Sequence, residues 1–124
     1  MVNMNTQLLL LIGLASLLAA CGAPSSGNLT PQEKLGRAKF VQQCAACHAI
    51  EADAMIVGPS LFGIAETAAT RVPGMDARSY IEESILEPSA FLNAGYIDLM
   101  PKTFGQTLDE NELDAVIAYL YTLQ

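Results

Sequence analysis

The chemistry and the architecture of this chain both follow from Cys44-Ala45-Ala46-Cys47-His48. This stretch holds two cysteines and, directly after the second, the only histidine among 124 residues. Two thiols at this spacing reach the two vinyl groups of one porphyrin, and the adjacent imidazole then lies under the iron. The pattern predicts one covalently bound haem c, attached through Cys44 and Cys47, with His48 as an iron ligand.

Two other uses of these thiols compete with haem attachment. A thioredoxin-like redox pair belongs in a βαβ unit, whereas these cysteines follow a predicted helix and precede an alanine-rich loop. A zinc site would need a fourth ligand beside Cys44, Cys47 and His48, and Cys21 is the only other soft candidate. The single histidine also excludes His₃ and HExxH zinc sites. Haem c is the favoured interpretation.

Residues 1–20 contain 14 apolar side chains and no charge, which is typical of an export signal. The apolar run from Leu8 to Ala20 is shorter than the roughly 20 residues that cross a bilayer core. It ends in Leu18-Ala19-Ala20-Cys21, which resembles the bacterial lipobox and implies cleavage before Cys21 and a diacylglycerol on its sulfur. Residues 1–7 lack Lys and Arg, which departs from that pattern and leaves an uncleaved helical anchor as the alternative.

Residues 21–29 are small and polar without periodicity, which indicates a flexible tether between the lipidated cysteine and one folded domain at 30–124. We therefore expect an exported protein, lipid-anchored in the periplasm or on the outer face of the cell membrane. Six Lys and Arg against 13 Asp and Glu give a formal net charge of −7. This balance disfavours a nucleic-acid partner.

The folded part begins at a helix start signal. Thr30-Pro31-Gln32-Glu33 combines a capping hydroxyl, a proline at the first helical position and a glutamate three residues after the cap. A helix over about 31–43 is expected, with its inward side chains at Leu35, Ala38 and Val41 or Phe40. Gly36 costs this helix about 1 kcal/mol relative to alanine, which indicates close approach of another backbone or ring.

Two further helices make the expected fold all-α, with three main helices and long loops. One begins at Gly74 or Asp76 and runs to Ile85, with Pro88 stopping it. The other follows a second capping-box pattern at 107–110 and continues to Leu123, with apolar residues every three or four positions.

Beyond the five-residue motif, the chain resembles the class I c-type cytochromes over about residues 31–123. The resemblance rests on Gly36 to His48, Gly58 to Gly63, Met100-Pro101 and Ala118-Tyr119-Leu120. It implies a last helix that crosses the first, with Tyr119 near Gly36 and Phe40. It also implies that the second ring nitrogen of His48 donates to the carbonyl of Pro59, which would fix the imidazole and raise its basicity.

Without a second histidine, the other axial ligand is expected to be a methionine from the folded part, which leaves Met55, Met75 and Met100. Met55 is seven residues from His48 and would have to reach the opposite haem face. Met75 lacks a following proline and is the second choice. Met100, followed by Pro101, matches the family pattern and is assigned as the ligand. Met55 and Met75 are instead expected to pack in the hydrophobic core.

Three side chains are candidates for contact with the haem propionates. Arg71 would form an ion pair with one of them, the alternative being a solvated loop charge. Tyr80 and Tyr96 could donate their hydroxyls, and core packing is the alternative for both.

Axial ligands on both sides leave the iron no open position, which favours electron transfer over catalysis. A second resemblance rests on Arg71, Pro73-Gly74, Tyr80-Ile81, Ser84-Ile85, Pro88, Gly95-Tyr96 and Met100-Pro101. Over this segment the chain resembles oxidase-linked cytochromes c and the small lipoprotein cytochrome of alternative complex III. This implies a membrane-tethered carrier, or a subunit of a quinol-oxidising or oxidase complex in a respiratory or photosynthetic chain. The alternatives are a haem peroxidase or sensor whose Met100 ligand dissociates, and a non-haem thiol or zinc lipoprotein.

Overall fold

The computed structural model describes residues 27–124, and its helices are α2 (Pro31–Gln43), α3 (Ile64–Ala68), α4 (Ala77–Leu86), α5 (Phe104–Thr107) and α6 (Glu110–Leu120). This range contains no strand, so the predicted all-α class is confirmed. The predicted leader, the lipidated Cys21 and residues 22–26 of the tether lie outside the described residues. None of the helices in 27–124 combines the length and apolarity needed to span a membrane.

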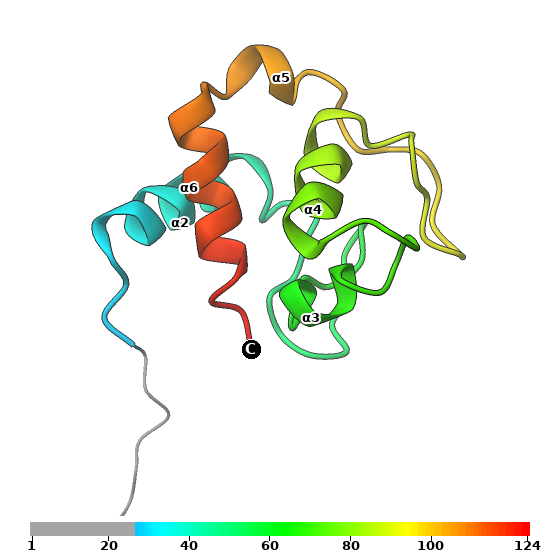
Figure 1. The fold of residues 1–124 in the computed structure, drawn as a ribbon, viewed down its shortest axis with the longest axis horizontal. Coiled ribbons are helices and arrows are strands. Elements are labelled where there is room, and N and C mark those ends of the chain that lie inside the picture. Colours follow the sequence, from blue (N-terminus) through cyan, green and yellow to red (C-terminus); the bar gives the residue numbers. More distant parts are fainter. Residues whose placement is uncertain (1–26) are drawn as a thin grey trace, which may run out of the picture.

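The two longest helices, α2 and α6, pack across each other, as seen at the left of Figure 1. Gly36 lies at their contact, where an added Cβ would overlap the carbonyl of Ala115 and lie 2.9 Å from the Cβ of Tyr119. The rings of Phe40 and Tyr119 pack beside it, with centroids 5.5 Å apart. The close approach predicted at Gly36 is confirmed, but what meets the glycine is chiefly the backbone of α6 rather than the tyrosine ring.

The buried side of α2 differs in part from the predicted one. Gly36 and Phe40 are buried, and Leu35 is half-buried. Ala38 is exposed, so its inward assignment was wrong. Of the two alternatives Val41 and Phe40, the buried one is Phe40, since Val41 is 62% exposed. The reason is that α6 meets α2 at the small surface of Gly36, which turns Ala38 and Val41 toward solvent.

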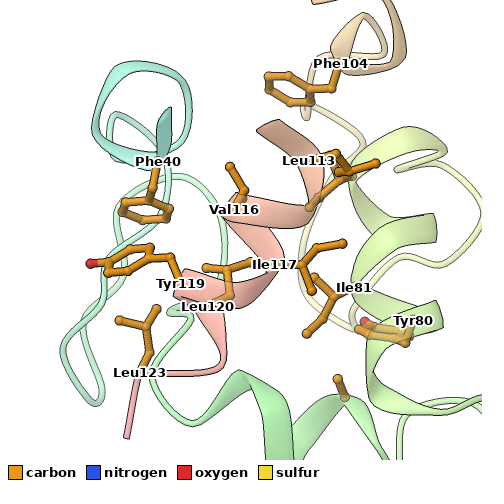
Figure 2. Close-up of a cluster of buried hydrophobic side chains, with 12 residues drawn as sticks. Phe40, Tyr80, Ile81, Phe104, Leu113, Val116, Ile117, Tyr119, Leu120 and Leu123 are labelled. Carbon is orange, nitrogen blue, oxygen red and sulfur yellow. The ribbon is translucent and has the colours of Figure 1, made fainter. Parts of the chain in front are cut away.

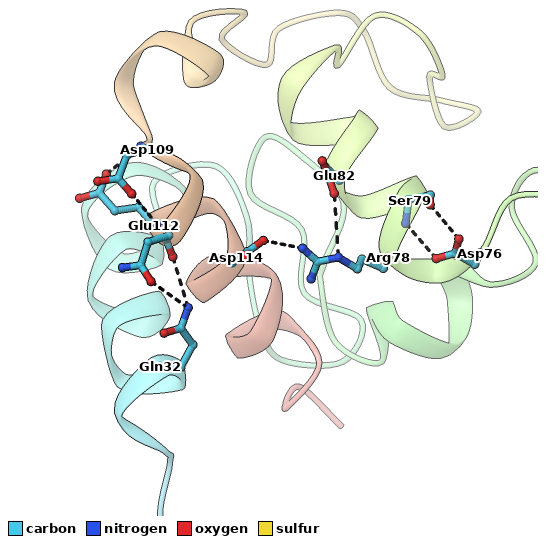
Figure 3. A network of polar contacts seen from close by, with 9 residues as sticks. Gln32, Asp76, Arg78, Ser79, Glu82, Asp109, Glu112 and Asp114 are labelled. Atoms are coloured by element: carbon cyan, nitrogen blue, oxygen red, sulfur yellow. Dashed lines mark hydrogen bonds and ion pairs between the residues drawn. The ribbon is translucent and has the colours of Figure 1, made fainter.

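The helix caps follow the expected chemistry, with one change of position. Thr30 and Glu33 form the predicted capping box of α2, and Asp76 caps α4 by accepting from the Ser79 N–H at 3.0 Å. The capping box of α6 is formed by Asp109 and Glu112 (Figure 3), not by Thr107 and Glu110. Thr107 is the last residue of the short helix α5 and lies two residues before the observed N-cap, so its hydroxyl does not cap α6.

The core lies between α6 and its neighbours, with Val116 and Ile117 as its most buried large side chains. Figure 2 shows α6 side chains pointing both toward Phe40 of α2 and toward Ile81 of α4. Helix α6 ends at Leu120, three residues before the predicted end, yet Leu123 stays buried beside the core. The short helices α3 and α5 were not predicted.

Charged side chains connect the helices at the surface. Arg78 of α4 pairs with Asp114 of α6 and, at 4.0 Å, with Glu82, as Figure 3 shows. Lys39 of α2 pairs with Glu112 of α6, and this contact lowers the pKa of the Glu112 carboxyl. Ion pairs at the protein surface contribute little to stability.

Candidate functional site

The two cysteines and the histidine lie on one tight turn that continues α2. The N–H of Cys44 donates to the carbonyl of Phe40 at 2.8 Å, and the N–H groups of Cys47 and His48 both donate to the carbonyl of Cys44 at 3.0 Å. The carbonyl of Cys47 accepts from the N–H of Gly58 at 2.8 Å. These bonds fold the following loop back over the turn and fix the relative positions of the thiols and the imidazole.

The imidazole of His48 is oriented by the backbone. Its Nδ1–H donates to the carbonyl oxygen of Pro59 at 2.8 Å, which is the hydrogen bond predicted from sequence. Since Nδ1 carries the proton, the lone pair of Nε2 is free to bind a metal. A Cβ on Gly58 would lie 2.5 Å from the ring atom Cε1 and 2.9 Å from Nδ1. Glycine is therefore required for the backbone to lie this close to the ring.

One cavity brings together five of the six predicted haem-contacting residues: Cys44, Cys47, His48, Pro59 and Met100. Its walls come from α2, α4, α6 and the loop before α5, and most of them are apolar. None of the described residues that line it is Asp, Glu, Lys or Arg. The cavity is thus suited to a flat apolar group, with a nitrogen and a sulfur available as axial ligands.

The three candidate methionines have different surroundings. Met100 lines the cavity, whereas Met55 and Met75 do not. Met75 packs half-buried against the hydrophobic core, as expected for filler. Met55 is 73% exposed, so the expectation that it fills the core was wrong. Its loop of small and polar residues around 51–55 runs along the surface and gives it nothing to pack on.

Of the three residues predicted to contact the haem propionates, two line the cavity and one does not. Tyr80 and Tyr96 line the cavity, and Tyr80 also packs edge-on against Phe91 with centroids 5.7 Å apart. Arg71 is exposed after α3 and does not line the cavity. The structure therefore does not bring Arg71 to the other site residues, and its pairing with a propionate stays a prediction.

Asn93 is a cavity residue that the sequence analysis missed. Its side-chain Oδ1 is buried and has no hydrogen-bond partner. An unsatisfied buried acceptor costs about 1–3 kcal/mol, which points to a partner that the polypeptide does not supply. The available signal was a lone amide in the run Ala90-Phe91-Leu92-Asn93-Ala94.

The surroundings of the Cys44 thiol do not favour thiol redox chemistry. Both Cys44 and Cys47 are free, and burial, together with the nearby Cys47, raises the pKa of the Cys44 thiol to about 11. Redox-active cysteines need the opposite shift, toward the thiolate. Within residues 27–124, no three His, Cys, Asp or Glu side chains are placed to hold a metal ion together. The donor set instead fits haem c: two thiols for its vinyl groups, Nε2 of His48 and the thioether of Met100 for its iron.

Comparison with family models identifies the family to which the chain belongs. A family model described as "Cytochrome C oxidase, cbb3-type, subunit III" matches residues 31–120, from the start of α2 to the end of α6. No curated protein matched the chain.

Proposed function

Since the chain belongs to this family and is a class I c-type cytochrome, we propose that it carries electrons through one haem c with His48 and Met100 as axial ligands. A cytochrome c domain of this kind indicates an electron carrier that holds haem c rather than an enzyme. One observation carries the finer proposal: Met100, distant in sequence, lines the same cavity as both thiols and His48.

Haem iron with imidazole and thioether ligands supplies a one-electron couple whose potential is raised by the sulfur. The protein's own groups set the conditions for that couple. Pro59 holds the His48 ring and raises the basicity of Nε2 through the Nδ1–H bond. With haem bound, the apolar walls would limit the access of water to the iron, and the thioether of Met100 would supply a ligand that competes with external molecules. These roles support electron transfer in preference to peroxide or gas binding.

The proposed protein works at a membrane surface. Cytochrome c domains are typically exported, and the apolar leader ending at Cys21 supports export with lipidation of that cysteine. Residues 21–29 would then let the domain reach about 15 Å from its anchor, for a flexible chain of this length. The site of action is the periplasm or the outer face of the bacterial membrane.

The proposed partners are redox proteins of a respiratory or photosynthetic chain. The name of the matching family refers to an oxidase subunit, which supports a place in an oxidase or quinol-oxidising complex, either as a subunit or as a tethered carrier. The net charge of −7 disfavours acidic partners, so a basic or an apolar docking face is expected on the other protein.

Purification of the full chain from its native membrane in mild detergent tests this proposal. We expect one haem c per chain by the pyridine haemochrome assay, an intact mass that includes diacylglycerol, and co-purifying redox subunits if the protein belongs to a complex. A colourless product with stoichiometric zinc would overturn the haem assignment. A reduced protein that binds CO promptly would favour the peroxidase or sensor.

A further inference from the structure

Asn93 combines a buried polar group with a position in the cavity wall. Its Oδ1 is the buried side-chain oxygen or nitrogen without a hydrogen-bond partner in residues 27–124. Its backbone carbonyl accepts from the N–H of Tyr96 at 3.1 Å, which holds the residue in a turn between α4 and Met100. The turn therefore presents the amide to the cavity that also holds the thiols and His48.

The surroundings of the amide offer little other polar chemistry. The polar side chains that line the cavity with Asn93 are uncharged and few: Gln43, Ser84, Tyr80 and Tyr96, besides the thiols and His48. Asp98 lies in the same loop, but its carboxylate already accepts from Ser89 Oγ and Lys102 Nζ, each at 2.8 Å. An anionic group in the cavity would thus find neutral donors and no basic side chain.

We propose that the side-chain amide of Asn93 hydrogen-bonds a propionate of the haem, an inference that rests on the proposed function. The iron takes His48 and Met100, and the vinyl groups take the two thiols. The remaining substituents of the ring are methyl groups and two propionates, so the propionates are the haem substituents that can hydrogen-bond a buried amide. A half-turn of the amide exchanges its oxygen and nitrogen, so Nδ2–H can donate to the ionised carboxylate.

This contact has a predictable effect on the reduction potential. A donor to the propionate offsets its negative charge, and that charge stabilises ferric over ferrous iron. Asn93→Leu removes the donor and should lower the midpoint potential, while Asn93→Asp adds a second carboxylate and should lower it further. Asn93→Ser restores a small donor and should recover part of the loss. Asn111→Ala, which changes an exposed amide on α6, should leave the potential unchanged.

Potentiometric titration of these variants in the full holoprotein is paired with NMR of the reduced, diamagnetic wild type. The proposal expects the order wild type, Asn93→Ser, Asn93→Leu, Asn93→Asp from highest to lowest potential, and nuclear Overhauser contacts between the Asn93 amide protons and propionate methylene protons. It would be overturned by contacts only to the Met100 methyl group, by no contacts to the haem, or by an Asn93→Asp potential equal to or above that of wild type. Failure of the proposed function is distinguishable, because the wild type would then contain no haem c.

Discussion

The crossing of α2 with α6 and the cavity beside α4 are both apolar, but only the crossing is closed by the polypeptide itself. At the crossing, Gly36 meets the backbone of Ala115, which is 0% exposed, and Tyr119 beside it is 5% exposed. Around the cavity, Ile97 is 74% exposed and Leu99 is 61% exposed, although both line it. This difference fits the proposal that covalent haem, rather than polypeptide, completes the apolar core beside α4.

The largest expected effect comes from removing the covalent attachment. The double change Cys44→Ala and Cys47→Ala should abolish covalent haem and, because the cavity walls then lose their partner, remove most of the cooperative thermal unfolding transition. Denaturing gels stained for haem and circular dichroism measure the two effects. Ala46→Ser, at an exposed position between the cysteines, keeps both thiols and should retain full haem content. Covalent haem in the double variant would contradict the attachment.

The second largest effect is expected at the crossing of α2 with α6. Gly36→Ala should destabilise the holoprotein by about 1–3 kcal/mol through overpacking, because the new Cβ overlaps the Ala115 carbonyl. Helix propensity alone predicts the opposite sign, a gain of about 1 kcal/mol. Urea unfolding separates the two.

Gly105→Ala is the matched control for this change, since its Cβ would meet only Leu86 Cδ2 at an ordinary 3.7 Å. It should be neutral or stabilising. If Gly36→Ala behaves like Gly105→Ala, the two helices do not make the close contact described.

A smaller effect, on the midpoint potential, is expected at Gly58, which lies against the His48 ring in the cavity wall. Gly58→Ala should push the His48 ring away from Pro59, because the added Cβ would lie 2.5 Å from Cε1. A weaker Nδ1–H bond makes the imidazole a poorer donor to ferric iron, so the midpoint potential should rise. Potentiometry measures this shift, and an unchanged potential would count against a role for the Pro59 bond in tuning the iron.

The smallest effect concerns the surface pair between Lys39 and Glu112. The pair lowers the pKa of the Glu112 carboxyl below its usual value of 4.5, so its small contribution to stability is present above that pH and is lost as the pH falls through the lowered pKa. Lys39→Ala should slightly reduce stability at pH 7 and leave it unchanged at pH 2, as measured by urea unfolding. Lys34→Ala, at an exposed position, is the control. Equal losses at both pH values would contradict the linkage.

The parts of the fold that sequence predicted are those set by local signals. The capping box at Thr30 fixed the start of α2, and Asp76 that of α4. The outward turn of Ala38 was missed because it depends on where α6 crosses, which is a contact between residues distant in sequence. The cap at Asp109 was missed because the predicted cap, Thr107, belongs to the short helix α5, which was not predicted.

In the site, too, local motifs were predicted, whereas features that depend on residues distant in sequence were not. The spacing of Cys44, Cys47 and His48 and the dipeptide Met100-Pro101 are legible in the chain, and the cavity brings them together. Asn93 belongs to no sequence motif. It is identified only because its Oδ1 is buried without a hydrogen-bond partner in the structure. Arg71 was chosen for its charge; it is exposed after α3 and does not line the cavity, and its pairing with a propionate stays a prediction.

The optical spectrum of the oxidised full-length protein tests most directly that His48 and Met100 bind one iron from the two sides of the cavity. We expect a methionine-sulfur to iron charge-transfer band in the wild type and in the control Met75→Leu. We expect no such band in Met100→Ala, whose reduced form should bind CO at once. A band that survives in Met100→Ala, or a wild type that lacks it and binds CO equally fast, would contradict the assignment of Met100 as the second ligand.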